Sequence, residues 1–201
     1  MDKPSTVAMD ANVCVVHALD LGVHAKTRIH DFDCRPVRCL VSGCQRDKIR
    51  IGTYQKTKKH TYNCLAERIE ELAQKCHLKN YWYAMSSLFK IGEKNLDKLF
   101  EILEIFPDNY SAEEVAIVAE FFKARGNDVR TFTDPNKPKV PESHDLELLV
   151  SSHNLWQGVT HIVSEDAHFV GNAQEIPSWG YKVAIIPMDK LNELEIFWRW
   201  T

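Results

Sequence analysis

Two short apolar runs, far apart in the chain, each lead directly into an acidic residue. The run that begins at Val7 leads into Asp10, and the run 160–164 leads into Glu165 and Asp166. Each run has the length and composition of a buried strand. Helical patterns separate the strand-like runs, so the chain predicts an α/β fold with a mainly parallel central sheet flanked by helices.

Further elements follow from the same hydrophobic patterns. Strands are also expected at 48–53 and 181–187, and helices at 13–19, 61–75 and 144–156. In parallel α/β sheets, function lies beyond the carboxyl ends of the strands. Two of the predicted strands end in an aspartate at that edge, which is the first indication of a functional site.

The middle of the chain, about 77–126, is expected to be a helical insertion. Apolar residues recur there at helical spacing, namely Leu96, Leu99, Phe100, Leu103 and Phe106. Pro107 is expected to end that helix, whereas Ser111 and Glu114 predict a capping box for a second one that stops near Gly126. Residues 133–143 contain three prolines and predict a loop.

Composition limits the class of protein. The chain has 201 residues, of which 44% are hydrophobic and 26% charged, so a single domain over 1–201 is expected rather than a disordered or low-complexity chain. No apolar run is long enough to cross a membrane, and the start carries no secretory-type apolar region. A cytoplasmic protein without membrane contact is therefore expected, with its six cysteines reduced.

The small net charge conceals an asymmetry between the two halves. Residues 1–100 carry 17 Lys and Arg against 11 Asp and Glu, whereas residues 101–201 carry 8 against 17. Much of the basic excess lies between Arg46 and His60, including Lys56, Lys58 and Lys59. A basic surface beside an acidic one suits an enzyme that binds a polyanion through a metal, although an unevenly charged solvated surface explains the same pattern.

Three aspartates are the candidate site residues. Asp10 and Asp166 follow predicted strands, and Asp145 lies in the first turn of the helix that leads toward the Asp166 strand. Any one of them alone is explained by a turn or a helix cap. Together they would repel one another unless a cation intervened, and clusters of oxygen ligands suit Mg²⁺ or Mn²⁺.

These segments resemble the PIN-domain ribonuclease family. Val7-Ala-Met-Asp10-Ala-Asn12 resembles the strand and acid that open that domain. His144-Asp145 before an apolar helix, and Ile162-Val-Ser-Glu-Asp166 with its following aromatic residue, resemble two later acidic sites in the same order. The resemblance implies a three-layer PIN-like fold with a helical insertion, and a nuclease domain that covers most of the chain.

By that resemblance the protein is a metal-dependent endoribonuclease that hydrolyses RNA, with single-stranded RNA as the expected partner. Asp10, Asp145 and Asp166 would hold Mg²⁺ or Mn²⁺, and Asn12 would orient Asp10 or contact substrate. Lys56, Lys58 and Lys59 are candidates for RNA binding, since basic grooves with aromatic residues suit single strands. A homodimer and an inhibitory protein partner are further options that the sequence leaves open.

One departure from the family pattern concerns a fourth acid. The family usually has a carboxylate early in the helix after the second strand, whereas residues 55–60 contain none. Glu67 is the candidate replacement, with Glu147 and Glu165 as alternatives. If none of them serves, the chain is a weak or inactive PIN-like module that binds RNA. An aspartate-nucleophile phosphatase is a third reading, opposed by Asn12 where an aspartate would be expected.

Overall fold

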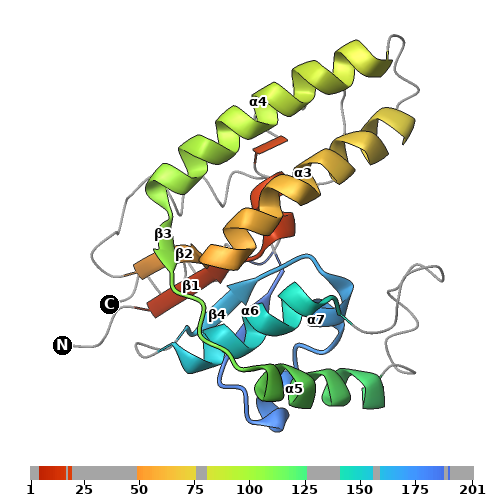
Figure 1. Cartoon of the computed structure of the whole chain (residues 1–201). Helices are drawn as coiled ribbons and strands as arrows, with labels where there is room; N and C mark the ends of the chain where they lie inside the picture. The colour runs from red at the N-terminus through yellow and green to blue at the C-terminus, as the bar shows by residue number, and fades with distance from the viewer. Residues whose placement is uncertain are drawn as a thin grey trace.

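The computed structural model describes residues 5–16, 18–19, 49–75, 81–125, 141–155, 159–187 and 190 (Figure 1). These residues form an α/β fold with one five-stranded sheet in the order β3-β2-β1-β4-β5. Every strand pair in it is parallel. The predicted α/β class with a mainly parallel sheet is therefore confirmed.

The elements follow one another along the chain with helices between most strands. The strands are β1 (Ser5–Met9), β2 (Ile49–Tyr54), β3 (Glu104–Phe106), β4 (His161–Val163) and β5 (Ala184–Ile186). The helices are α3 (Gln55–Lys75), α4 (Tyr81–Ile102), α5 (Ala112–Arg125), α6 (Ser143–Asn154) and α7 (Ala167–Gly171), with a 3₁₀ turn η2 (Ile176–Trp179). Residues 11–16 and 18–19, directly after β1, are also helical, as the apolar run at 13–19 predicts.

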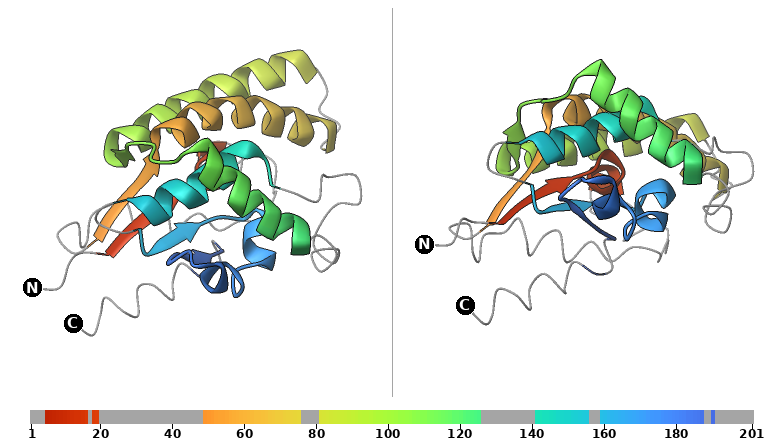
Figure 2. Two further views of the ribbon diagram at one scale, coloured as in Figure 1. Left: turned by 60° about the horizontal axis from the view of Figure 1, so that its bottom comes forward. Right: turned by 90° about the horizontal axis from the view of Figure 1, so that it is seen from below.

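The two faces of the sheet carry separate apolar cores, because side chains alternate along a strand. On β1, Val7 and Met9 pack with residues of α3 and α4. Ala8, between them, packs with residues of α5 and α6. Figure 2 shows the long α3–α4 pair and the shorter α5–α6 pair as separate helical groups. The result is a helix–sheet–helix arrangement in three layers.

Strand β3 corrects the prediction of continuous helix through Leu103 and Phe106. Helix α4 ends at Ile102, and the next residues pair with β2 in register, with Tyr54 opposite Phe106. Phe106 is buried and its ring meets Tyr54 edge to face, with centroids 5.6 Å apart. The segment 77–126 therefore contributes an edge strand to the sheet and is not purely a helical insertion. Its apolar residues satisfy helical spacing up to Phe100, beyond which sheet pairing prevails.

Helix α3 begins six residues before the predicted start at 61. Its first turn contains no acidic residue that would favour a helix N-terminus. Instead, the Asp108 carboxylate accepts a 3.0 Å hydrogen bond from the Lys56 backbone N–H. This helix cap comes from a residue distant in sequence, so local patterns do not reveal it.

The other expected elements are found with shifted ends. Helix α6 spans Ser143–Asn154, and β5 is shorter than the predicted run at 181–187. Gly126 and residues 133–140 lie outside the described residues. No helix within the described ranges is long and apolar enough to cross a bilayer.

The strand order creates a switch point between β1 and β4. From β1 the chain builds outward through β2 and β3 on one side, and later through β4 and β5 on the other. In open parallel sheets the connections diverge at such a point, which leaves a crevice at the carboxyl ends of the two strands. The residues that follow β1 and β4 are therefore the first place to look for a site.

Candidate carboxylate and histidine site

Asp10 and Asp166 meet at the switch point through Ser164. The Ser164 hydroxyl donates a 2.6 Å hydrogen bond to Asp10 Oδ2 and accepts a 3.0 Å hydrogen bond from the Asp166 backbone N–H. The Asp10 backbone N–H in turn donates to the Val163 carbonyl. The ends of β1 and β4 are thus joined by a chain of polar contacts, as expected from two strands that each lead into an acid.

Several donors orient the Asp10 carboxylate. The Ala11 backbone N–H donates to Oδ1 at 2.6 Å, and Asn12 Nδ2 donates to Oδ2 at 3.1 Å. Asn12 Oδ1 also accepts from the Glu165 backbone N–H at 3.3 Å. Asn12 therefore bridges the turns after β1 and β4, and its described contacts indicate a positioning residue.

The environment of Asp10 disfavours its negative charge. The side chain is buried, and no Lys or Arg among the described residues forms an ion pair with it. Desolvation by burial, with repulsion from Asp145 and Asp166, raises its pKa from 3.8 to about 7, even though hydrogen bonds from Ser164 and Ala11 oppose the rise. A divalent cation would supply the missing positive charge and favour the ionised form.

Asp145 approaches Asp10 from the start of α6. Its side chain is buried in the first helical turn, where Oδ2 accepts a 3.2 Å hydrogen bond from the Glu142 backbone N–H. Oδ1 lies 2.9 Å from Nε2 of His144. The aspartate therefore serves as part of the helix cap and also projects its charge toward Asp10, as its effect on the Asp10 pKa indicates.

Asp166 lies at the N-terminus of α7. Its Oδ1 accepts a 2.7 Å hydrogen bond from the His168 backbone N–H and lies 2.9 Å from Nδ1 of the same residue. His168 is itself buried. Two contacts from one residue thus fix the orientation of the Asp166 carboxylate.

A second cluster, which the sequence analysis did not identify, adjoins the aspartates. His60 of α3, Glu142 and His144 have ligand atoms that all lie within 4.8 Å of one another, and among the described residues this is the one group of metal-binding side chains at that spacing. The three aspartates are more widely spaced. His60 lies 84 positions before His144, so no spacing motif connects them. The one feature in the sequence that pointed to this region was the neighbouring pair His144-Asp145.

The basic start of α3 lies against the start of α6. Lys56 Nζ is 2.5 Å from the carboxylate of Glu147 and 5.6 Å from the Tyr110 ring centroid. Lys58 Nζ lies 5.1 Å from the Phe100 ring centroid, whereas Lys59 is exposed. The predicted RNA-binding lysines therefore differ: Lys56 is engaged by a carboxylate, and Lys59 projects into solvent.

None of the three candidates for a fourth acid has a described side-chain contact with Asp10, Asp145 or Asp166. Glu67 is exposed on α3, and no described hydrogen bond or ion pair connects it to Asp10. Glu147 is buried but turns toward Lys56 and Ser143. Glu165 contributes its backbone N–H to Asn12. The described polar network thus contains three predicted acids, together with histidines in the region where a fourth was sought.

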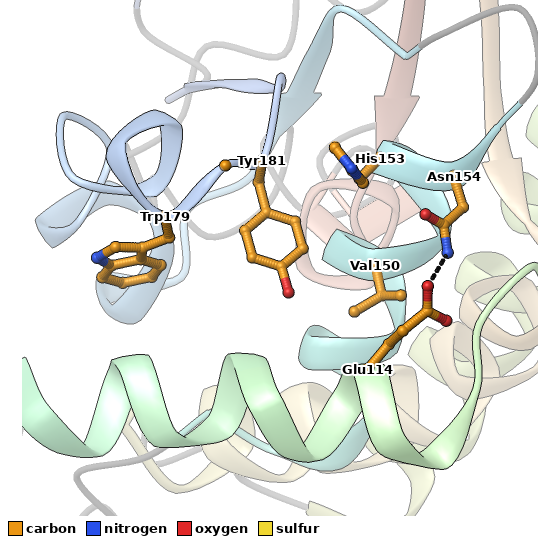
Figure 3. Close-up of a pocket in the computed structure, with 7 residues that line it drawn as sticks. Glu114, Val150, His153, Asn154, Trp179 and Tyr181 are labelled. Carbon is orange, nitrogen blue, oxygen red and sulfur yellow. Dashed lines mark hydrogen bonds between the residues drawn. The ribbon is translucent and has the colours of Figure 1, made fainter.

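A separate pocket lies at the opposite end of α6 (Figure 3). Tyr181 and Trp179 line it beside His153 and Glu114, and Glu114 accepts a 2.9 Å hydrogen bond from Asn154 Nδ2. Trp179 also stacks on Phe121 with ring centroids 5.4 Å apart. These contacts belong to the packing of α5 against α6 and against η2, and none of the predicted site residues lines the pocket.

Comparisons with family models, with curated proteins and with solved structures give no match for this chain. The geometry alone therefore defines the class: an α/β protein with two buried aspartates and one half-buried aspartate, bordered by histidines, at the switch point of a parallel sheet.

Proposed function

We propose that this protein is a PIN-like endoribonuclease that uses Mg²⁺ or Mn²⁺ to hydrolyse single-stranded RNA at the Asp10, Asp145 and Asp166 cluster. The observation that supports it is the junction at Ser164, where Asp10 and the Asp166 backbone contact one hydroxyl at the ends of neighbouring strands. Asp145 adds a third carboxylate that acts electrostatically on Asp10. A carboxylate cluster at a sheet switch point suits metal-assisted phosphodiester hydrolysis.

The donor set fits the proposed cation. Mg²⁺ and Mn²⁺ prefer carboxylate oxygens, and Mg²⁺ in particular keeps several water ligands while it binds one or two carboxylates directly. Three aspartates that are too widely spaced for direct contact with one ion therefore remain compatible with it. When bound, such an ion activates a water molecule and neutralises charge on the phosphodiester group.

The chain's own residues orient the ligands and exclude water. Asn12 and Ser164 hold the Asp10 carboxylate, whereas His144 holds that of Asp145. His168 holds the carboxylate of Asp166. Burial of Asp10 keeps bulk water away from its carboxylate and strengthens its interaction with a nearby cation.

RNA would approach over the exposed start of α3. Lys59 is exposed there, and Lys58 lies above the Phe100 ring. His60, one position further along the helix, contacts His144 with ring centroids 3.5 Å apart. His60 and His144 thus lie between the basic start of α3 and the carboxylate cluster. The lysines of this segment would place positive charge for a phosphate backbone close to the proposed metal.

The rival proposal is an RNA-binding module without hydrolytic activity. The observation that favours it is the exposed position of Glu67, which leaves the described cluster without a fourth carboxylate. A metal held by fewer carboxylates binds more weakly, so turnover would be slow or absent. Salt-dependent RNA binding without metal-dependent cleavage would distinguish this module from a nuclease.

The test is a cleavage assay on end-labelled single-stranded RNA, with Mn²⁺, with Mg²⁺ and with EDTA. Wild type is compared with Asp10→Asn and Asp166→Asn, and with Glu101→Gln as a control that neutralises an exposed acid on α4. We expect cleavage by wild type and the control only, and only with a metal. Cleavage that persists in EDTA, or that Asp10→Asn performs as well as wild type, would refute the proposed active site.

A further inference from the structure

The cluster of His60, Glu142 and His144 has a composition that the proposed nuclease chemistry does not require. His60 comes from α3, Glu142 immediately precedes α6, and His144 lies in the first turn of α6. Their ligand atoms lie within 4.8 Å of one another. The two imidazoles are half-buried and the carboxylate is exposed, so the group opens to solvent on one side.

We infer that His60, Glu142 and His144 form a second metal site, which binds a transition-metal ion of the Zn²⁺ type. Two imidazoles and one carboxylate match the three protein ligands of many zinc sites that keep an open fourth position. Such nitrogen-rich donor sets suit Zn²⁺, Co²⁺ and Ni²⁺ better than Mg²⁺. The site would therefore differ in metal preference from the all-carboxylate cluster beside it.

The distance between His144 and Glu142 matches that between two ligands of one ion. Metal–nitrogen distances of about 2.0–2.1 Å place the ligand atoms of a tetrahedral zinc site roughly 3.4 Å apart. The His144 Nδ1 and Glu142 Oε2 atoms are already 3.4 Å apart. Because Glu142 is exposed, a small rotation of its side chain is unhindered by packing.

His144 already has the outer contact of a metal-binding histidine. Its Nε2 atom lies 2.9 Å from the Asp145 carboxylate, while Nδ1 faces Glu142. In metal sites, the nitrogen that does not bind the ion commonly donates to a carboxylate, which fixes the ring orientation. His144 would therefore present Nδ1 to the ion and Nε2–H to Asp145.

The second imidazole is also held in place. His60 Nε2 lies 2.9 Å from the Cys64 thiol one turn along α3, and its ring lies 3.5 Å from that of His144 between centroids. The Cys64 contact therefore helps to fix the orientation of the His60 ring. The alternative explanation is a stacked histidine pair held by the Cys64 thiol and by the carboxylates beside His144, and this alternative predicts no specific metal binding.

Asp145 connects the two metal sites. Its Oδ1 faces His144, and its charge also acts on Asp10. An ion at the histidine site would therefore lie one side chain away from the carboxylate cluster. The second site would add positive charge on the path proposed above for RNA, and this last point rests on the proposed function.

The test measures metal binding directly and does not depend on RNA cleavage. The full metal-free chain is titrated with Co²⁺, followed by its visible absorption, and with Zn²⁺ in competition. Histidine side-chain NMR signals of ¹⁵N-labelled protein identify the ligands. The variants are His60→Gln and Glu142→Gln, with His153→Gln as the control at the other end of α6 and Asp10→Asn as the control for the carboxylate cluster.

We expect wild type, His153→Gln and Asp10→Asn to keep the metal equivalent whose binding shifts the His144 side-chain signals, and His60→Gln to lose it. Glu142→Gln, a change at an exposed residue, should fold normally and weaken that equivalent by at least about tenfold. Equal binding by wild type and by both His60→Gln and Glu142→Gln would overturn the inference, whether or not the protein cleaves RNA. If Asp10→Asn still binds this metal equivalent, the histidine site exists independently of the proposed nuclease site.

Discussion

The Ser164 hydroxyl donates a 2.6 Å hydrogen bond to the Asp10 carboxylate and so joins two residues that lie 154 positions apart in the sequence. The same oxygen accepts a hydrogen bond from the Asp166 backbone N–H. This one buried side chain therefore determines how the turns after β1 and β4 meet. Its removal should affect both the fold and the proposed metal site.

We predict that Ser164→Ala lowers the free energy of unfolding by about 1–3 kcal/mol, because it leaves buried partners without a hydrogen bond. It should also weaken Mn²⁺ binding, since Ser164 helps to keep the Asp10 carboxylate ionised. Urea unfolding and Mn²⁺ titration measure the two effects. Ser152→Ala is the matched control, because this buried serine donates to the Leu148 carbonyl away from the site. Equal loss of Mn²⁺ affinity in both variants would contradict the assignment.

The raised pKa of Asp10 predicts a specific dependence of stability on pH. Between its ordinary value of 3.8 and about 7, the folded protein keeps a proton on Asp10 that the unfolded chain has lost. The free energy of unfolding of the metal-free protein should therefore fall as pH rises through this range. Above about pH 7, Asp10 should cause no further fall in the free energy of unfolding. Repulsion from Asp145 and Asp166 contributes to the raised pKa of Asp10, so the slope depends on both of these charges.

Asp10→Asn tests this pH prediction. The variant has no carboxyl group to titrate at that position, so in EDTA its stability should fall less steeply from pH 4 to pH 7 than that of wild type. Urea unfolding at several pH values gives both slopes. Identical slopes would show that Asp10 has an ordinary pKa in the folded protein. Near neutral pH the metal-free variant should be the more stable protein.

Metal binding should offset the free-energy cost of ionising the buried Asp10 carboxylate. We predict that Mn²⁺ raises the thermal midpoint of wild type, with a stabilisation of about 2.7 kcal/mol at a free concentration of 100 times the dissociation constant. The effect should grow with pH, because the ion binds the deprotonated carboxylates. Thermal unfolding with Mn²⁺ and with EDTA measures it. An Asp10→Asn variant stabilised as strongly as wild type would place the ion elsewhere.

The sequence was informative about the sheet and the aspartates for a physical reason. Parallel strands place their carboxyl ends at one edge, so acids that follow two apolar runs come together once those strands are neighbours. Asp10 and Asp166 satisfied this condition. Asp145 was predicted in the first turn of the helix that leads toward the Asp166 strand, and it lies in the first turn of α6, where its charge acts on Asp10.

The features that the sequence did not reveal depend on long-range contacts. Residues 104–106 continue an apolar helical pattern, and only pairing with β2 makes them a strand. Helix α3 begins where Asp108 accepts from its first turn, which local capping rules do not anticipate. The imidazoles of His60 and His144 meet because α3 packs on α6, and no local motif encodes that contact.

Gly52 is the backbone position with the least room for change. A Cβ atom there would lie 2.2 Å from the Glu104 carbonyl oxygen and 2.7 Å from the Phe106 ring. We predict that Gly52→Ala destabilises the protein by about 1–3 kcal/mol or more, because β3 must move away from β2. Gly180→Asn is the control, since this open position has a φ of 95° that asparagine tolerates. Equal stability of Gly52→Ala and wild type would argue against the β2–β3 pairing.

Lys56 and Lys59 should have different roles although they lie only three positions apart in the sequence. Lys56 is exposed but pairs with the buried Glu147, so Lys56→Gln should lower stability by about 1 kcal/mol. Lys59 is exposed, so Lys59→Gln should leave stability unchanged. If Lys59 contacts a phosphate, its loss should weaken binding of single-stranded RNA and reduce the slope of log affinity against log salt concentration by about 0.7.

Urea unfolding and RNA titration at several salt concentrations, in EDTA to prevent cleavage, separate these roles of the two lysines. Lys123→Gln on α5 is the control for a general loss of positive charge, because Lys123 is exposed and pairs only with Glu120 among the described contacts. A salt slope that Lys59→Gln and Lys123→Gln change equally would mean that RNA responds to net charge alone. A slope that changes only for Lys59→Gln would place the RNA backbone along the start of α3, next to the imidazoles and the carboxylate cluster.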